Sequence, residues 1–326
     1  MDKPAPRALH VFAVAVAAAT LLLVVAGGLV TSTESGLSVP DWPTTYGHAM
    51  FAFPLSKMVG GIRFEHSHRL IASAVGLLTI ILAIWLARRE ERRWVRRLGY
   101  LALAAVVTQG VLGGLTVIYL LPTPVSVAHG CLAQVFFCLV VTIAVVTSPR
   151  WRQAPPASLA AAFRRTAVSR IAAATTAVVF LQLLVGAIMR HTKAGLAIPD
   201  FPLALGRVVP PLESFPVAIA FAHRIGALVV AACVAASAVY AFRSGRRGLE
   251  KGALWLCALV LGQVTLGALT VLTGKSVAVT TAHVATGALL LVSTLALGVS
   301  ALALERRHDN VVPIRPSAPR RATAWK

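Results

Sequence analysis

Long apolar stretches separated by short polar connections run through almost the whole chain. Eight of them reach about 18 residues or more, the length that lets a helix cross the hydrocarbon core of a bilayer. They lie near residues 9–30, 65–87, 98–121, 125–147, 170–190, 216–242, 252–273 and 276–304. The pattern predicts an all-α integral membrane protein with eight transmembrane helices. The first stretch is interpreted as a retained helix, because its end recurs in the fifth.

The second half of the chain repeats the first. Gly36–Pro43 reads GLSVPDWP, and Gly195–Pro202, 159 residues further on, reads GLAIPDFP. Each half holds four apolar stretches, so each returns the chain to its starting side and the halves share one orientation. We therefore divide the chain into an N-terminal four-helix half at 1–148, a cytoplasmic linker at 149–169, a C-terminal four-helix half at 170–304 and a disordered cytoplasmic tail at 305–326.

Composition and charge agree with a membrane protein. The mean hydropathy is +0.79, only 13% of residues are charged, and the net charge is +20. Most of the 31 Lys and Arg lie in the tails and in the connections 88–97, 150–170 and 243–251. By the positive-inside rule the termini are cytoplasmic, and the loops 31–64 and 191–215 are extracytoplasmic. This basic excess faces anionic membrane lipid, so nucleic acid is not expected as a partner.

Four histidines recur at matched positions, since His68 and His129 correspond to His223 and His283. All four lie within about two turns of the outer ends of their predicted helices, and hence at one level. A zinc site normally adds cysteine or carboxylate ligands and a copper site methionine or cysteine, and no such set accompanies them. Two helices that each present a histidine at equal depth favour bis-histidine ligation of haem iron. Depth alone leaves open whether the pairs form within the halves or across them.

Small residues surround these histidines. Glycines there can either leave room for a macrocycle or allow close helix–helix packing. The glycines concerned are Gly113, Gly114, Gly130, Gly226, Gly267 and Gly287.

One charged residue breaks the repeat. Glu65 stands three residues before His68, whereas Ala220 stands three residues before His223. Residues three apart share a helix face, so a ligand held by His68 would lie near the carboxylate. We predict that Glu65 acts as an acid, a base or a cation-stabilising group. The alternative is a carboxylate near a helix start that only interacts with the helix dipole.

Arg69 and Arg224 each follow one of the repeated histidines. An arginine at this depth can bind a haem propionate or extend outward to the membrane surface. His66 is two residues from His68, so the two point about 200° apart on a helix. The repeat favours His68 as the ligand, and the role of His66 stays open.

The segment Glu65-His66-Ser67-His68-Arg69, together with Gly28-Leu29-Val30 and the loop from Ser35 to Pro43, resembles the haem A synthase family. The family pattern is a glutamate, two residues and His-Arg, with further histidines opening helices 4, 6 and 8, and the resemblance covers about 10–304. It implies two four-helix bundles related by pseudo-twofold symmetry. It also implies an enzyme that oxidises the C8 methyl of haem O to a formyl group through a hydroxymethyl intermediate (haem I), for terminal oxidase biogenesis.

The resemblance also implies roles for the site residues. A haem b cofactor would be held by His223 and His283, and substrate haem O by His68 and His129, with Glu65 beside the reacting methyl. The implied partners are haem O synthase, oxidase assembly factors and an electron acceptor, and a homo-oligomer is also open. The implied location is the cell (inner) membrane, with the haem sites toward the extracytoplasmic side.

One departure from the family and two alternative functions bear on this interpretation. Many family members carry a cysteine pair in the first loop, whereas 31–64 has none, so electrons take another route or the pair is dispensable. A di-haem b-type electron-transfer subunit would share the four histidines but would not need a carboxylate at only one haem. A duplicated transporter would place polar groups near mid-bilayer, where these helices are apolar.

Overall fold

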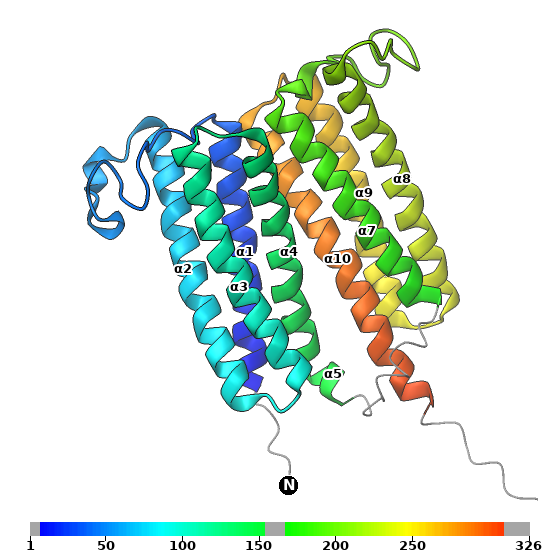
Figure 1. The fold of residues 1–326 in the computed structure, drawn as a ribbon. Helices are drawn as coiled ribbons and strands as arrows, with labels where there is room; N and C mark the ends of the chain where they lie inside the picture. Colours follow the sequence, from blue (N-terminus) through cyan, green and yellow to red (C-terminus); the bar gives the residue numbers. More distant parts are fainter. Residues whose placement is uncertain (1–6, 154–166, 310–326) are drawn as a thin grey trace, which may run out of the picture.

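The computed structural model describes residues 7–153 and 167–309, and long helices make up most of them (Figure 1). The long helices are α1 Arg7–Ser32, α2 Gly60–Arg89, α3 Arg93–Ile118, α4 Thr123–Thr147, α7 Ala167–His191, α8 Phe215–Arg243, α9 Arg247–Leu272 and α10 Val277–Asp309. The short helices are η1 Met50–Ala52, η2 Leu55–Lys57, α5 Pro149–Arg152 and η3 Ala194–Leu196.

All eight long helices are long and apolar enough to cross a membrane, which confirms the predicted number of spans. The observed bounds extend beyond the apolar stretches at several ends, because a helix continues into the polar interface. α2 begins five residues before Glu65, and α10 continues to Asp309, through part of the segment 305–326 that we expected to be disordered. Residues 310–326, and most of the predicted linker, lie outside the described residues.

Local sequence explains how these helices begin and persist. Proline stands in the first turn of α4 and α8, where its missing N–H costs no hydrogen bond. Within the helices, threonine hydroxyls donate to the carbonyl four residues earlier, as Thr20 does to Val16 and Thr79 to Val75. These bonds satisfy hydroxyl groups that would otherwise lack a partner in an apolar setting.

The helices form two four-helix groups, α1–α4 and α7–α10, that stand side by side (Figure 1). Within each group the first helix contacts the second and fourth, and the third contacts the second and fourth. Between the groups α4 contacts α10, while α1 contacts α10 and α4 contacts α7. If the helices α1–α4 exchange places in order with α7–α10, the same set of helix contacts results. These contacts are therefore consistent with the predicted pseudo-twofold arrangement.

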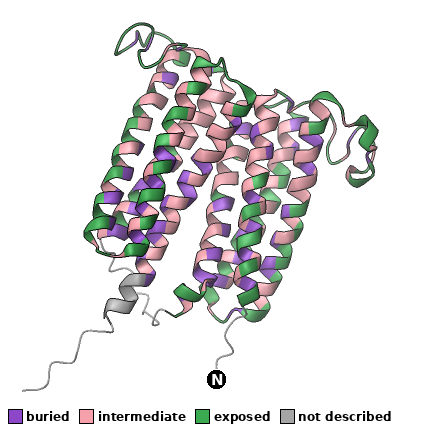
Figure 2. Ribbon diagram, turned by 180° about the vertical axis from the view of Figure 1, so that it is seen from behind, coloured by how far each residue is buried: buried purple, intermediate pink, exposed green. Residues whose placement is uncertain are grey.

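Apolar side chains fill the interior of each group and the seam between them. One cluster includes Val75, Leu82 and Ile143, a second includes Val234 and Leu256, and a third joins α4 to α10 across the seam. Buried residues occupy the faces that helices turn toward one another, and the outward faces are exposed (Figure 2). Many exposed side chains are large and apolar, as expected where lipid replaces water around a multi-pass membrane protein.

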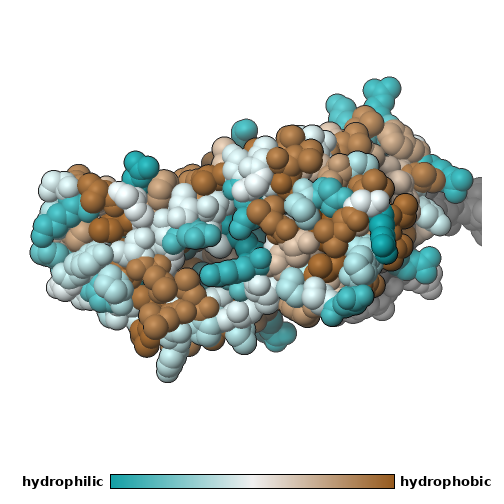
Figure 3. Space-filling view, turned by 90° about the horizontal axis from the view of Figure 1, so that it is seen from above, coloured by the Kyte–Doolittle hydropathy of each residue, from teal (hydrophilic) through white to brown (hydrophobic). Residues whose placement is uncertain are grey.

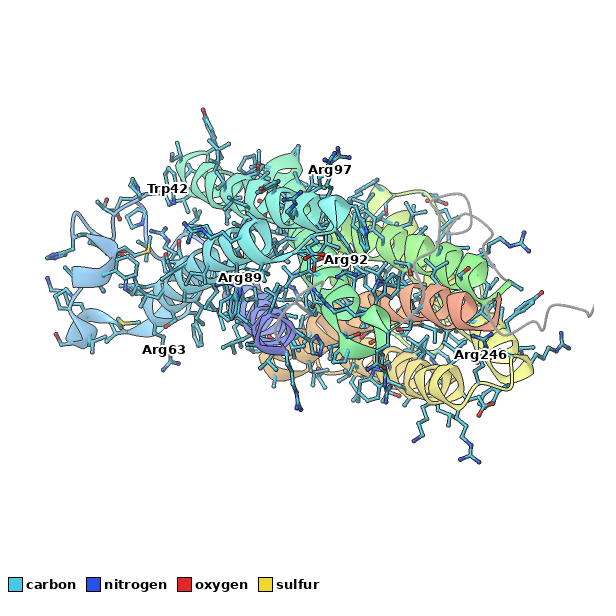
Figure 4. All side chains as sticks on the ribbon, turned by 90° about the horizontal axis from the view of Figure 1, so that it is seen from below. Trp42, Arg63, Arg89, Arg92, Arg97 and Arg246 are labelled. Carbon is cyan, nitrogen blue, oxygen red and sulfur yellow. The ribbon has the colours of Figure 1, made fainter. Side chains whose placement is uncertain are left out.

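The two ends of the molecule differ in charge and structure. The long loops 33–59 and 192–214 lie at one end, which we call the loop end (Figure 1). Arg89, Arg92, Arg97 and Arg246 lie at the opposite end (Figure 4). This distribution is the one expected if the end opposite the loops faces the cytoplasm.

A buried carboxylate ties the end opposite the loops together. Glu90, in the turn between α2 and α3, accepts hydrogen bonds from Arg92 Nε at 2.8 Å and from Arg92 Nη2 at 3.0 Å, and it also pairs with Arg152. Burial opposes ionisation, but the Arg92 hydrogen bonds and the two positive charges outweigh it and lower the pKa of Glu90. The ionised carboxylate therefore links the turn to the segment that follows α4.

Candidate functional site

The four repeated histidines come from matched helices of the two groups: His68 on α2, His129 on α4, His223 on α8 and His283 on α10. The rings of His223 and His283 lie in an edge-to-face arrangement, with centroids 6.4 Å apart and planes inclined at 67°. His68 and His129 occupy the matched positions of the N-terminal half, each against a glycine of the preceding long helix. The structure therefore brings the histidines together within each half, which depth along the helices could not decide.

The geometry of the histidine pair in the C-terminal half fits a metal held between two imidazoles. With metal–nitrogen bonds of about 2 Å on opposite sides of one ion, two ring centroids lie about 6 Å apart. In the N-terminal half, the buried Nδ1 atoms of His68 and His129 have no hydrogen-bond partner among the described residues, and the same holds for His283. No group of three His, Cys, Asp or Glu side chains gathers anywhere in 7–153 or 167–309. A tetrapyrrole iron, which needs only two protein ligands, fits this donor set better than zinc.

Each of these four rings rests against a glycine of the preceding long helix. We call these glycines the ring seats, and the pairs are Gly27 with His68, Gly113 with His129, Gly186 with His223 and Gly267 with His283. A β-carbon added at the four seats would lie 3.1, 3.3, 2.9 and 3.1 Å from the ring Cε1 atoms, respectively. Any larger residue would therefore crowd the imidazole.

The ring seats also orient the imidazoles in one common way. In every pair Cε1 is the ring atom nearest the added β-carbon and Nδ1 comes next. Among the glycines expected to leave room for a macrocycle, Gly113 and Gly267 thus make room for imidazole rings. Gly226 is occupied differently, because the side chain of Gln182 lies against it.

Gln182 distinguishes the C-terminal pair from the N-terminal pair. Its Nε2 donates to the carbonyl of His223 at 2.7 Å and lies 3.1 Å from His223 Nδ1. In the repeat register that places Gly186 over Gly27, Gln182 corresponds to Leu23, which offers no such bond. His223 therefore has a side-chain partner that His68 lacks.

Glu65 is buried, with only 4% of its surface exposed, and both of its oxygens are engaged. Oε2 accepts from the Val39 N–H at 2.8 Å, and Oε1 accepts from Arg69 Nη2 at 2.7 Å. In the other half Ala220 packs in an apolar cluster with Ile198, the counterpart of Val39. A carboxylate offers about four acceptor positions, so Glu65 retains capacity for a proton or a further donor.

The two repeated arginines hold the long loops in place. Arg69 donates to the carbonyls of Val39, Asp41 and Thr44, and Arg224 donates to those of Ile198, Asp200 and Leu203. These bonds direct the charged groups toward the loop backbone. A propionate-binding role for Arg69 or Arg224 stays a prediction.

An aspartate completes the same loop structure in each half. Asp41 accepts from Thr44 Oγ1 and from the N–H groups of Tyr46 and Gly47. Burial acts against ionisation, yet these hydrogen bonds prevail and lower the pKa of Asp41 to about 2. Asp200 accepts from the Gly206 and Leu205 N–H groups, and these bonds lower its pKa as well.

His66 lies on α2 and contacts the first long loop, not the histidine pair. Its Nδ1 lies 3.1 Å from Thr45 Oγ1, and its ring centroid lies 5.0 Å from that of Phe53. His66 is almost fully buried by these contacts. His66 therefore supports the first long loop from below.

Arg190 is a charged residue near the sites that the sequence did not single out. It lies in the last turn of α7, and its Nη2 donates to Ser32 Oγ at 2.9 Å and to the Gly28 carbonyl at 3.3 Å on α1. The repeat places Thr31 at the corresponding position of the first half. Arg190 therefore has no charged counterpart in the first half.

Comparisons with known proteins bear on this arrangement. A family model described as cytochrome oxidase assembly protein matches residues 10–295. The chain belongs to this family. Similar proteins include one from Symbiobacterium thermophilum that is 35% identical, covering 81% of this chain and 85% of the relative. One from Rhodopseudomonas palustris is 30% identical over 90% of each chain, and one from Geobacillus kaustophilus is 30% identical over 85% of this chain and 86% of its own. All three are named haem A synthase, which confirms the family resemblance.

Proposed function

We propose that this chain is a haem A synthase, which oxidises the C8 methyl of haem O to a formyl group through a hydroxymethyl intermediate. Family membership and the names of relatives aligned over most of both chains support the activity. The observation that carries the proposal is an asymmetry between two similar sites. Each half pairs two histidines, but only the N-terminal half places a buried carboxylate, Glu65, three residues before a histidine.

We assign haem b to His223 and His283, and substrate haem O to His68 and His129. The ring spacing of 6.4 Å suits a metal held between two imidazoles, and the bond from Gln182 Nε2 to the His223 carbonyl fixes the backbone of α8 at this histidine, as suits a resident group. When bound, haem b supplies one-electron transfer. The N-terminal pair, without such a bond, suits a ligand that must enter and leave.

Oxidation of a methyl to a hydroxymethyl group with water as the oxygen source releases two electrons and two protons. Glu65 is an anion fixed in place by the Val39 N–H and Arg69, so it needs no reorganisation as positive charge develops on the methyl carbon. Its free acceptor positions can take a proton from the attacking water. The two electrons would pass to an electron acceptor, and a haem b held by His223 and His283 would supply the one-electron chemistry.

Replacement of Glu65 by glutamine tests this assignment. The amide keeps the size of the side chain and its acceptor for the Val39 N–H, but it removes the charge. We expect haem b to remain bound while haem A formation falls about a hundredfold or more. The measurement is extraction and chromatography of the haems from cells and from purified protein. Glu213→Gln, in the second long loop, is the control, and haem A at the wild-type level in Glu65→Gln would refute the role.

The remaining assignments concern location and partners. We propose that the loop end is extracytoplasmic and that the termini are cytoplasmic in the cell membrane, because the basic connections gather at the opposite end (Figure 4). Haem O synthase and oxidase assembly factors are the proposed partners. Labelling of a single cysteine introduced into the loop 33–59, with a membrane-impermeant reagent applied to intact cells, checks the orientation.

A further inference from the structure

We propose that Arg190 binds a carboxylate of the tetrapyrrole held between His223 and His283, and so forms the anion subsite of the C-terminal half. The inference rests on the proposed function, since it requires that this pair ligate a tetrapyrrole iron. A haem of the b type carries two propionate carboxylates. A guanidinium is the side chain best matched to them, because its planar fork can donate two parallel hydrogen bonds.

Arg190 is placed on the face of α7 that serves this pair. Gln182, Gly186 and Arg190 are spaced four residues apart, so they form one stripe along the helix. Gln182 binds His223, and Gly186 is its ring seat. Arg190 follows one turn nearer the loop end.

The hydrogen-bonding capacity of Arg190 is largely unused. A guanidinium has five N–H donors, and the two contacts of Arg190 both come from Nη2. Its Nη1 and Nε have no partner among the described residues. The repeated arginines differ, since Arg69 makes four hydrogen bonds and Arg224 makes three.

Arg190 also lacks a counter-charge in the described part of the chain. The buried acids Glu65 and Glu90 pair with Arg69, Arg92 and Arg152, and neither pairs with Arg190. A charge within a membrane protein is costly unless it is paired. The dipole of α7 favours a cation in its last turn, but Nη2 points to α1 and not to the carbonyls of α7. An anionic ligand would complete the environment of this group.

The position of Arg190 is accessible to such a ligand. The residue is only half-buried, at the loop end where α7 meets α1. Figure 3 views this end and shows hydrophilic side chains near the middle of the molecule, between the apolar patches of the two helix groups. The first half has Thr31 at the matched position, so the subsite belongs to the C-terminal half alone.

The test compares binding of ferric haem b with binding of its dimethyl ester, in which both carboxylates are neutral. The full-length chain is produced in haem-limited cells with His68→Ala, so that low-spin absorbance reports the C-terminal pair. We expect this protein to bind the free acid at least tenfold more tightly than the ester. Arg190→Gln should lose about tenfold or more of its affinity for the acid and keep its affinity for the ester. Arg190→Lys should retain part of the preference.

Lys193→Gln is the matched control, because it removes one exposed charge three residues further on. If Lys193→Gln lost as much affinity for the free acid as Arg190→Gln, the inference would be overturned. The same holds if the ratio of acid affinity to ester affinity is unchanged in Arg190→Gln. If Arg190→Gln does not fold, the protein that carries only His68→Ala still tests the inference. Equal affinities of that protein for haem b and for the dimethyl ester would overturn it. Added anionic phospholipid that abolishes the acid preference would show that Arg190 takes a lipid phosphate instead. Absence of low-spin absorbance with both ligands in every variant would contradict the proposed function itself.

Discussion

At the scale of single residues, the sequence repeat identified the four candidate histidine ligands but not the residues that orient their rings. The matched histidines and the unmatched Glu65 could be read directly from the two halves of the sequence. The ring seats could not be identified from the sequence, because a glycine that allows close helix packing looks the same there as a glycine that makes room for an imidazole ring. Gln182 and Arg190 were missed because they lie on α7, which carries none of the repeated histidines, so nothing in the sequence linked them to a site. Like Glu65, each lacks a matching residue in the other half.

The ring seats make a graded prediction for the C-terminal pair. Gly186→Ala places a β-carbon 2.9 Å from Cε1 of His223 and should displace the ring, with a loss of about 10- to 100-fold in haem affinity. Gly267→Ala, at 3.1 Å from His283, should cost less. Haem titration followed by visible absorbance measures both.

Gly262→Ala on α9 is the control, because an added β-carbon there meets nothing within 4 Å. This change should leave haem affinity unaltered and slightly favour the helix. Equal affinities in all three variants would show that the glycines do not position the rings.

At the scale of elements, hydrophobic periodicity predicted the eight helices well and their ends less well. α3 begins at Arg93, within a basic connection, because a helix can continue into the interface where arginine side chains reach water. The loops were predicted only as loops. Their attachment by Arg69, Arg224 and the two aspartates depends on carbonyl groups that come together only in the folded chain.

The turn between α2 and α3 should depend on the charge of Glu90. We expect Glu90→Gln to lower the free energy of unfolding by about 1–3 kcal/mol at pH 7, because two arginines lose their anion. The folded-state pKa of Glu90 is lowered, so its stabilising contribution is complete above the ordinary value of 4.5 and declines as the pH falls below it. Thermal unfolding in detergent from pH 7 to pH 3 measures this difference.

Glu91→Gln serves as the comparison for this turn, since Glu91 is its exposed neighbour. Exposed charges contribute little to stability, so this variant should unfold like the unaltered protein. Glu90→Gln and the unaltered protein should differ less in free energy of unfolding as the pH falls. If the difference stays constant toward low pH, the effect of Glu90 is not ionic.

At the scale of the whole molecule, two similar helix groups meet along α4 and α10 and carry one histidine pair each. Duplication predicted two sites, but only the folded chain shows that the pairs form within the halves. The halves then diverge in polar residues: Glu65 in the first, and Gln182 and Arg190 in the second. This divergence supports one reactive site and one site for a resident cofactor.

The most direct test of that division compares His68→Ala with His223→Ala. Haems extracted from each purified variant are separated by chromatography, and visible spectra are recorded before extraction. We predict that His223→Ala lacks the low-spin haem b spectrum, whereas His68→Ala keeps that spectrum and yields no haem A. Loss of haem b from His68→Ala with its retention in His223→Ala would contradict the assignment of the two halves.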